Sequence, residues 1–211
     1  MNVSANVPAN VKAFVENIDN PSIVLLKSPG VLEWLYGEDT FKAFLNATER
    51  GRQSAEEYRK SLQALENDWG RKLPIRGMKG LQWTNNFGEI LVEELFTIQG
   101  KTVSEPKSRN GKKPDREINT HMLEAKAETH FTSGTAGEKI LGTPFKYAEV
   151  PRLFEKPLLI VCLGGAEVSC RHQYGNIGDI DVSEEKKAFL AFFRTMGIEY
   201  VGATDILSAM C

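Results

Sequence analysis

The longest apolar run in the chain is LLIVCLGGA, residues 158–166. A helix that crosses a bilayer needs about 20 apolar residues, so this run is too short to span a membrane. A short apolar run bounded by Gly and Pro is typical of a buried β-strand. Helical patterns precede and follow it, and helices that pack on a sheet bury its strands. The run therefore predicts a sheet surrounded by helices, and no membrane role.

The N-terminal part of the chain carries helical patterns. EDTFKAFLNATERG is a helical segment that stops at Gly51, and SAEEYRKSLQALENDWG opens with Ser54 and Glu57 in the register of a capping box. The stretch RKLPIRGMKG, rich in Gly, Pro and cations, is typical of a linker. We predict a helical N-terminal region over 1–80 and a second region over 81–211. In the SAEEYRKSLQALENDWG helix the apolar stripe is formed by Tyr58, Leu62, Leu65 and Trp69.

The second region alternates between helix and strand patterns. TNNFGEILVEELFTIQG has an apolar face at helical spacing and ends at Gly100. KTVSEPKS and KKPDREI flank Asn110-Gly111, the strongest short hairpin signal. HMLEAKAET alternates between apolar and charged residues as a strand does. GTAGEKILGTPFKYAEVPRLF contains two short helical pieces broken at Gly142 and Pro144.

The C-terminal part adds one helix and one strand. DVSEEKKAFLAFFRTMG is an amphipathic helix, and we expect Phe189, Phe192 and Phe193 to face inward. IEYVG fits an edge strand. Together with the buried strand at 158–166, these patterns predict an α+β fold in which a central mixed sheet is flanked by helices.

Two acids and a base fall close together around the predicted hairpin. Asp115 follows a proline on one strand, and Glu124 and Lys126 lie on the next. Residues two apart on a strand project from the same face, about 7 Å apart along the strand. Carboxylates on neighbouring strands suit Mg²⁺, which takes one or two carboxylates and keeps water and phosphate oxygens as its other ligands. Zinc is disfavoured because His121 and His130 do not share a helical face and no Cys lies nearby.

A cation beside such a pair can position an attacking water and stabilise charge that builds on phosphate oxygens. Lys126 is placed for that role. Glu89, on the preceding helix, is a fourth candidate, and Glu93, one turn later, shares its face, so either acid could complete the site. The alternative for Glu89 is a capping box with Asn86.

The order Glu89, Pro114-Asp115, Glu124-x-Lys126, in helix, strand, strand context, resembles the PD-(D/E)XK nuclease superfamily. The whole looks like a type II restriction endonuclease. The resemblance covers roughly residues 84 to 165, including a helix before the catalytic hairpin and a helix and strand after it.

This resemblance implies a restriction-endonuclease-like nuclease core over 81–211. The helical region over 1–80 would then serve dimerisation or DNA recognition. Residues 1–80 and 166–211 carry no signal of the family, so the target sequence and the dimer contacts lie outside the match.

The resemblance also implies a reaction and its residues. The enzyme would hydrolyse phosphodiester bonds in double-stranded DNA with Mg²⁺ and leave 5′-phosphate and 3′-hydroxyl ends. Asp115 and Glu124 would bind Mg²⁺, with the backbone carbonyl of Ala125 as a further ligand. Lys126 would orient the nucleophilic water, and Glu89 would hold a second metal or a metal-bound water. Whether one or two ions act stays open.

Partners and location follow from the same resemblance and from composition. A site-specific enzyme that reads a palindrome by two-fold symmetry is expected to be a homodimer. A companion DNA methyltransferase acting on the same site is left open. Three cysteines without metal-site spacing, and an N-terminus without a signal-peptide pattern, fit a cytoplasmic location.

The formal charge of −2 excludes a strong positive field over the whole chain, so contact with DNA must be local. The hairpin GKTVSEPKSRNGKK is rich in cations and is the best candidate to face phosphates. The loop SCRHQYGNIGD carries side chains able to read base edges. We expect DNA contacts from Lys107, Arg109, Lys112, Lys113, Lys139, Lys146, Arg171, His172, Gln173 and Asn176.

Plainer explanations exist for these residues. Asp115 could be a turn residue, and Glu124 and Lys126 could be a surface pattern on a half-exposed strand. Two other functions stay open: a repair or junction-resolving nuclease with the same chemistry, and a non-catalytic DNA-binding protein on a nuclease-like scaffold. Solvated charges, more than metal ligands, are expected at Glu93, Glu94 and Glu128.

Overall fold

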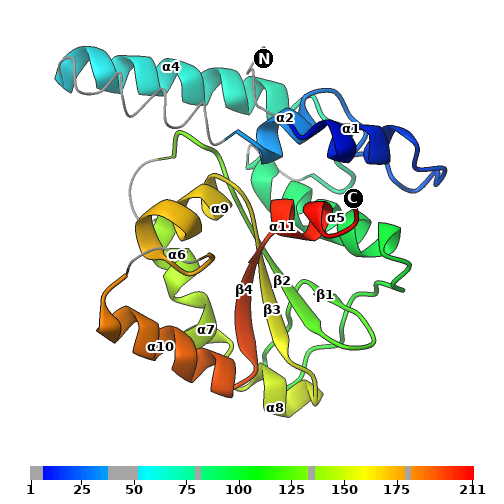
Figure 1. Ribbon diagram of the computed structural model, residues 1–211, viewed down its shortest axis with the longest axis vertical. Coiled ribbons are helices and arrows are strands. Elements are labelled where there is room, and N and C mark those ends of the chain that lie inside the picture. The colour runs from blue at the N-terminus through cyan, green and yellow to red at the C-terminus, as the bar shows by residue number, and fades with distance from the viewer. Residues whose placement is uncertain (1–6, 38–51, 79–81, 133–135, 179–181) are drawn as a thin grey trace.

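A four-stranded sheet forms the centre of the chain in the computed structural model (Figure 1). The structure describes residues 7–37, 52–78, 82–132, 136–178 and 182–211. The strands stand in the order β1-β2-β3-β4. β1 is antiparallel to β2, whereas β2, β3 and β4 are parallel, so the predicted mixed sheet is confirmed. Their bounds are Arg116–Glu117 (β1), Met122–Glu128 (β2), Leu158–Gly164 (β3) and Ile198–Gly202 (β4).

β3 lies between two parallel neighbours and is almost entirely buried, as its apolar run predicts. Parallel strands need long crossovers, and helices supply both of them. The first contains α6 (Ala136–Leu141), α7 (Thr143–Lys146) and α8 (Val150–Phe154). The second contains α9 (Gly165–Ser169), a π-helical turn (Cys170–Tyr174) and α10 (Glu184–Thr195). Three short helices replace the two expected: Pro144 lies in the first turn of α7 and Pro151 in the first turn of α8, where proline is tolerated, so each proline begins a helix.

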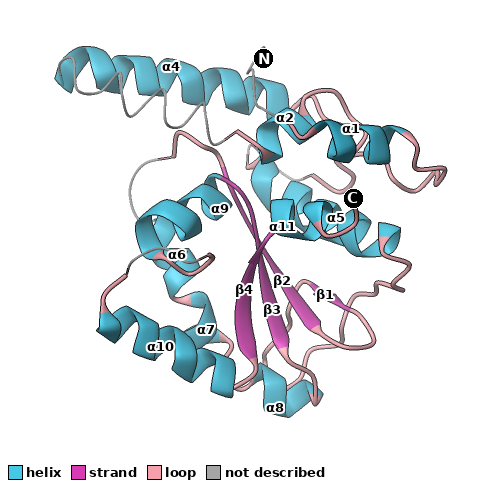
Figure 2. Cartoon of the chain, in the orientation of Figure 1, coloured by secondary structure: helices cyan, strands magenta, loops and turns pink. Residues whose placement is uncertain are grey.

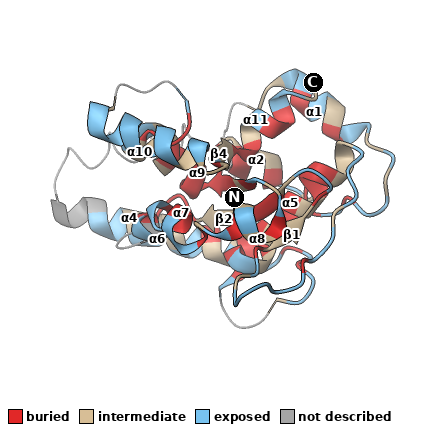
Figure 3. Ribbon diagram, turned by 90° about the horizontal axis from the view of Figure 1, so that it is seen from below, coloured by how far each residue is buried: buried red, intermediate tan, exposed pale blue. Residues whose placement is uncertain are grey.

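Helices cover both faces of the sheet (Figure 2). On one face, Leu123, Ala125 and Ala127 of β2 pack in a core that includes α5 (Trp83–Ile98). On the other, Met122 joins a core with residues of α6, α8 and α9. The first core also contains α1 (Ala9–Glu16), α2 (Val31–Leu35) and α11 (Ala203–Ser208). Buried residues gather where these helices meet the sheet (Figure 3).

α4 (Arg52–Gly70) buries only part of the apolar stripe that its sequence predicts. Tyr58 and Leu65 are 49% and 58% exposed, whereas Glu66 on another side of the helix is fully buried. Polar contacts hold this helix to the rest of the molecule. Glu66 Oε1 accepts hydrogen bonds from Trp34 Nε1 at 2.6 Å and from the His130 backbone N–H at 3.0 Å. The expected stripe is therefore only partly buried: Trp69 packs on the core beside Trp34 and Trp83, whereas Tyr58 and Leu65 face outward.

The inward-facing phenylalanines predicted for α10 are also partly wrong. Phe189 and Phe192 are 65% and 59% exposed, and only Phe193 packs against the sheet-side core. α10 lies along β4, the edge strand, and touches the sheet with a narrow side. The remaining apolar side chains of the helix therefore face outward.

The turns agree more closely with the sequence. Asn110 and Gly111 have positive φ angles of 49° and 73°, as the predicted hairpin turn requires, and Arg109 pairs with Lys112 across it. The strand after the turn is short, since β1 has only two residues. The helical segment expected to stop at Gly51 falls on residues 38–51, outside the described part of the chain. Within that described part, every helix is too short or too polar to cross a bilayer.

Candidate active site

Asp115 lies where the ladder between β1 and β2 ends. The register pairs Arg116 with Leu123, which brings Asp115 level with the next residues of β2. Its Oδ2 accepts a hydrogen bond from the Ala125 backbone N–H at 2.8 Å. The Asp115 carboxylate thus takes the place of a strand partner and is held against the edge of β2.

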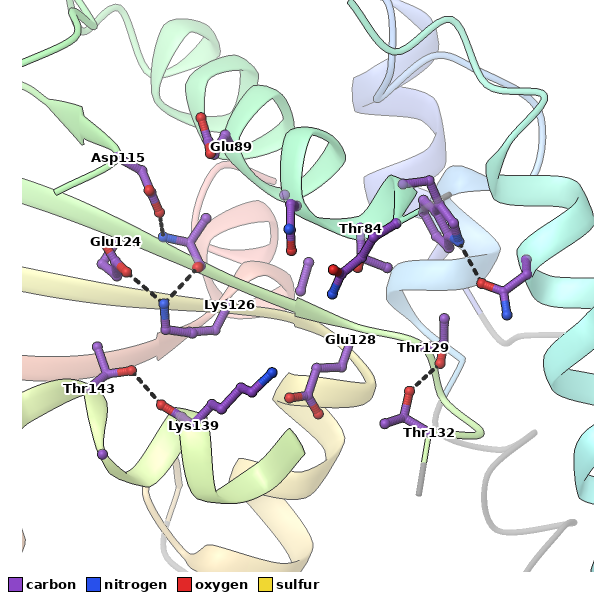
Figure 4. Close-up of a pocket in the computed structure, with 18 of the residues that line it drawn as sticks. Thr84, Glu89, Asp115, Glu124, Lys126, Glu128, Thr129, Thr132, Lys139 and Thr143 are labelled. Carbon is purple, nitrogen blue, oxygen red and sulfur yellow. Dashed lines mark hydrogen bonds and ion pairs between the residues drawn. The ribbon is translucent and has the colours of Figure 1, made fainter. Parts of the chain in front are cut away.

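Glu124 and Lys126 project from the face of β2 opposite to Ala125. Lys126 Nζ donates to Glu124 Oε1 at 2.6 Å and to the Ala125 carbonyl oxygen at 3.3 Å (Figure 4). Glu124 is only 3% exposed, so the pair is not a surface pattern on a half-exposed strand. The structure therefore brings Asp115, Glu124 and Lys126 together from adjoining parts of the hairpin, as the sequence predicts.

α5 approaches β2 closely at Gly88. A Cβ at this position would lie 2.8 Å from the Ala127 Cβ, closer than two such carbons can pack, so glycine is required here. α5 begins at Trp83, four residues earlier than a cap at Asn86 would allow, and Asn86 instead donates to the Gly77 carbonyl oxygen. The capping box of Asn86 and Glu89 was therefore wrong, and Glu89 is free to face the hairpin.

Arg116 forms ion pairs with both candidate acids of α5, Glu89 and Glu93. Its Nη1 donates to Glu89 at 3.0 Å and its Nε donates to Glu93 at 3.1 Å. Glu93 also binds Arg76 at 2.5 Å, and it does not line the cleft described below, whereas Glu89 does. Glu94 is buried and accepts from the backbone N–H groups of residues 24–26, so it is neither solvated nor near the hairpin acids.

A cleft of about 660 Å³ contains the hairpin acids and their neighbours. β2 forms one side, and α4, the start of α5 and the α6–α7 segment form the others. Lys139 and Lys146 line it from α6 and α7, and Glu128 faces Lys139 within it (Figure 4). The cleft therefore combines carboxylates, cations and open space beside Lys126.

Burial and like charge shift the titration of the acids. Burial, with the nearby Glu124 charge as the second cause, raises the pKa of Asp115 to about 6. Burial, and then the Asp115 charge, raises the pKa of Glu89. Burial also raises the pKa of Glu128. Asp115 and Glu89 thus lie close enough to other acids of the cleft for those charges to oppose their ionisation.

The residues present fit a divalent cation. Glu124 Oε2 is buried and has no hydrogen-bond partner among the described residues. Two carboxylates that repel each other are stabilised by a shared cation, and Mg²⁺ needs only one or two carboxylates. A group of three or more His, Cys, Asp or Glu side chains placed to hold a metal is absent from the described residues. Glu89 forms an ion pair with Arg116. Asp115, Glu124 and the Ala125 carbonyl are accordingly the best-placed ligands.

The four hairpin cations expected to contact DNA lie outside the cleft lining, and three of them already have partners. Arg109 donates to the Leu153 carbonyl oxygen at 2.8 Å and Lys112 donates to the Lys146 carbonyl oxygen at 2.9 Å. Lys113 contacts Glu105, and Lys107 is exposed. Of the lysines expected to meet phosphate, Lys139 and Lys146 are the ones that line the cleft.

The segment expected to be a base-reading loop is helical instead. Arg171, His172 and Gln173 lie in the π-helical turn, and Asn176 is buried just after it. Arg171 Nη2 binds Glu167 at 2.8 Å and Asp205 at 2.6 Å. The loop was predicted from its glycines. In the structure Gly175 ends the π-helical turn, and Gly178 lies after it. None of the four side chains lines the cleft with the hairpin acids.

Sequence reasoning missed several residues of the site. Arg116 is the ion-pair partner of Glu89, and Tyr147 lies beside the two hairpin acids, where burial and then the charges of Glu124 and Asp115 raise the pKa of its phenol. Lys146 Nζ lies 4.5 Å from the centre of the Tyr147 ring. No local pattern marks these residues, because their positions depend on how separate elements pack. Four carboxamides from α4 and from residues at or just before the start of α5 also line the cleft: Gln63, Asn67, Gln82 and Asn85.

Comparisons of the chain with protein-family models, with curated proteins and with solved structures find no match. The chemistry of the cleft must therefore be inferred from its own geometry. That geometry is two close carboxylates, a buried carboxylate oxygen without a hydrogen-bond partner in the described part of the chain, and a lysine beside an open cleft.

Proposed function

We propose that this protein is a Mg²⁺-dependent endonuclease that hydrolyses phosphodiester bonds in double-stranded DNA, with a restriction-endonuclease-like core. The convergence of Asp115, Glu124 and Lys126 in one cleft is the observation that carries the proposal. Glu124 adds support because one of its oxygens is buried without a partner among the described residues, as expected of a metal ligand. The hairpin geometry matches the motif Pro-Asp followed by Glu-x-Lys on the next strand.

Asp115, Glu124 and the Ala125 carbonyl would hold the ion. When bound, Mg²⁺ would neutralise these carboxylates and polarise the scissile phosphate. Lys126, which already reaches Glu124 and the Ala125 carbonyl, would orient the attacking water and stabilise charge on the phosphate oxygens. Glu89 lies close enough to influence Asp115 and would order water at the same end of the cleft.

The water oxygen would form a bond to phosphorus while the bond from phosphorus to the 3′ oxygen breaks. The products are a 5′-phosphate and a 3′-hydroxyl. Lys139 and Lys146, on the α6–α7 side of the cleft, would bind the phosphates of the substrate. The near-neutral net charge fits an enzyme that concentrates its cations at one site.

We propose further that cleavage is site-specific and that the active species is a homodimer, as in type II restriction enzymes. A two-fold dimer reads a palindromic site with two copies of one cleft. A companion methyltransferase acting on the same site, and a cytoplasmic location, are parts of the same proposal.

Digestion of a sequenced plasmid, with Mg²⁺ and separately with EDTA, tests this function. We expect discrete fragments with Mg²⁺ and intact plasmid with EDTA, and ligation of the fragments should require no repair of their ends. A smear with Mg²⁺ would contradict site specificity, and cuts confined to branched DNA would point to a junction-resolving enzyme. Intact plasmid and intact branched DNA under both conditions would contradict the function itself.

A further inference from the structure

We propose that the end of the cleft away from Asp115 is a base-reading subsite built from four carboxamide side chains, and that it selects adenine near the scissile bond. This inference rests on the proposed nuclease function. Two of the side chains come from α4, one from the first turn of α5 and one from the residue just before α5. They are Gln63, Asn67, Gln82 and Asn85.

The cleft is divided by charge. Glu89, Asp115, Glu124 and Lys126 lie toward one end, Glu128 lies farther along β2 and faces Lys139, and the four amides are neutral (Figure 4). Phosphates are held mainly by cations, whereas base edges present adjacent donors and acceptors without net charge. Carboxamides both donate and accept, and a single Asn or Gln can meet the paired donor and acceptor of adenine. The neutral end therefore suits bases better than the backbone of DNA.

Two of the amides already have a partner on their oxygen. Asn67 Oδ1 accepts a hydrogen bond from Trp83 Nε1 at 3.0 Å, and Gln63 Oε1 accepts one from Arg59 Nη1 at 3.5 Å, which leaves the NH₂ group of each as a donor. Asn85 and Gln82 are exposed beside Asn67, and Gln63 is half-buried one turn earlier on α4. Thr84, only 8% exposed, adds a hydroxyl to the same lining. Glu128 is the acid nearest to this part of β2, and Lys139 faces it.

The subsite lies within reach of the scissile bond. β2 lines the cleft from Glu124 to Glu128, and four residues of strand span about 13 Å. A DNA strand advances about 3.4 Å for each base. The amides should therefore meet bases within about four nucleotides of the cut.

This assignment places recognition in α4 and α5 and not in the π-helical turn. Arg171 is tied to Glu167 and Asp205, and Gln173 opens into a different cavity, next to Phe189 and Tyr200. The two locations make different predictions for substitutions, which allows a direct comparison.

The test is digestion of a DNA library with randomised sequence, with Mg²⁺, followed by sequencing of the new ends. Wild type is compared with Gln63→Glu and Asn85→Asp, and with Gln173→Glu as the matched control. The first two substitutions keep side-chain shape but replace an NH₂ donor by an acceptor, which favours the cytosine N4 donor. We expect adenine preference near the cut in the wild type and a change of about tenfold toward cytosine in these variants, since each base contact is worth about 1–3 kcal/mol.

Unchanged base preference in Gln63→Glu and Asn85→Asp, with cleavage retained, would overturn the subsite and leave the nuclease function intact. A change in Gln173→Glu alone would also overturn it. If the wild type does not cut, the proposed function fails, and fluorescence anisotropy with labelled adenine-rich and cytosine-rich duplexes in EDTA decides the subsite. If the ratio of the affinities for the adenine-rich and cytosine-rich duplexes is the same in wild type and Asn85→Asp, the subsite is rejected.

Discussion

At the scale of single residues, a strand pattern decided which side chains share a face. Glu124 and Lys126 were predictable because residues two apart on β2 must project together, and Ala125 between them faces α5. For Asp115, the sequence predicted only that it would lie on the strand next to Glu124 and Lys126. Its hydrogen bond to the Ala125 N–H depends on β1 beginning only at Arg116, which the sequence does not show, since the expected strand was longer.

Removing the lysine tests its role. We expect Lys126→Met to slow cleavage by about 10²–10³-fold, because a positioned charge at the reacting phosphate is lost. Mg²⁺ binding, measured by calorimetry, should persist, since both carboxylates remain. Cleavage at the wild-type rate by a correctly folded Lys126→Met protein would remove this residue from the mechanism.

The two acids of α5 should differ in effect. Glu89→Gln should lower the cleavage rate because Glu89 lines the cleft and senses the Asp115 charge. Glu93→Gln serves as its matched control, since Glu93 binds Arg76 and Arg116 outside the cleft lining. The rates should be measured under single-turnover conditions. A larger loss of cleavage rate in Glu93→Gln than in Glu89→Gln would show that Glu93, and not Glu89, completes the site.

At the scale of secondary-structure elements, periodicity located the helices but not always their inward sides. α4 presents an apolar stripe, yet it is attached through Glu66, Arg59 and backbone groups after β2. A single buried acid in a polar helix adds nothing to the hydrophobic periodicity of the sequence, so that periodicity does not show that the Glu66 side of α4 faces inward. The position of α4, and with it one side of the cleft, could therefore not be predicted.

Glu66 makes this attachment sensitive to pH. Burial raises its pKa to about 7 from the ordinary 4.5, so its contribution to stability is complete below 4.5 and is lost as the pH rises through about 7. Burial lowers the pKa of His130 to about 4, and its contribution is lost instead as the pH falls from 6.5 through that value. Glu66→Gln retains His130. The variant should therefore no longer lose stability as the pH rises toward 7, but it should still lose stability as the pH falls below 6.5.

The measurement is thermal unfolding of wild type and Glu66→Gln at pH 5 and pH 8. Relative to the variant, the wild type should lose on the order of 3 kcal/mol between these values. That corresponds to a relative drop in Tm of several degrees for a domain of this size. A constant difference in Tm at both pH values would show that Glu66 is not titrating in the folded protein.

At the scale of the whole molecule, the order of helix and strand patterns along the sequence predicted the correct class of fold. Alternating helix and strand patterns led to a mixed sheet covered by helices on both faces. Composition could not locate the charges in space. Two of the ten residues expected to contact DNA, Lys139 and Lys146, line the cleft, because crossover helices fold back over β2.

These two lysines should dominate the salt dependence of DNA binding. We expect the double variant Lys139→Ala, Lys146→Ala to bind duplex DNA more weakly at every sequence. The slope of log K against log salt should fall by about 2, since each phosphate contact contributes about 1. Lys12→Ala, Lys72→Ala, at exposed positions outside the cleft lining, is the control. Equal slopes in the two double variants would place the phosphate contacts elsewhere.

The most direct test of the central claim is the Mg²⁺-dependent cleavage rate of one duplex substrate by wild type, Asp115→Asn and Glu138→Gln. Asparagine keeps an oxygen for the Ala125 N–H but removes a metal-binding charge. Glu138 is an exposed acid on α6 outside the cleft lining. We predict cleavage by wild type and Glu138→Gln and a loss of at least about 10²-fold in Asp115→Asn. Equal rates for all three proteins, or cleavage that persists in EDTA, would contradict the account.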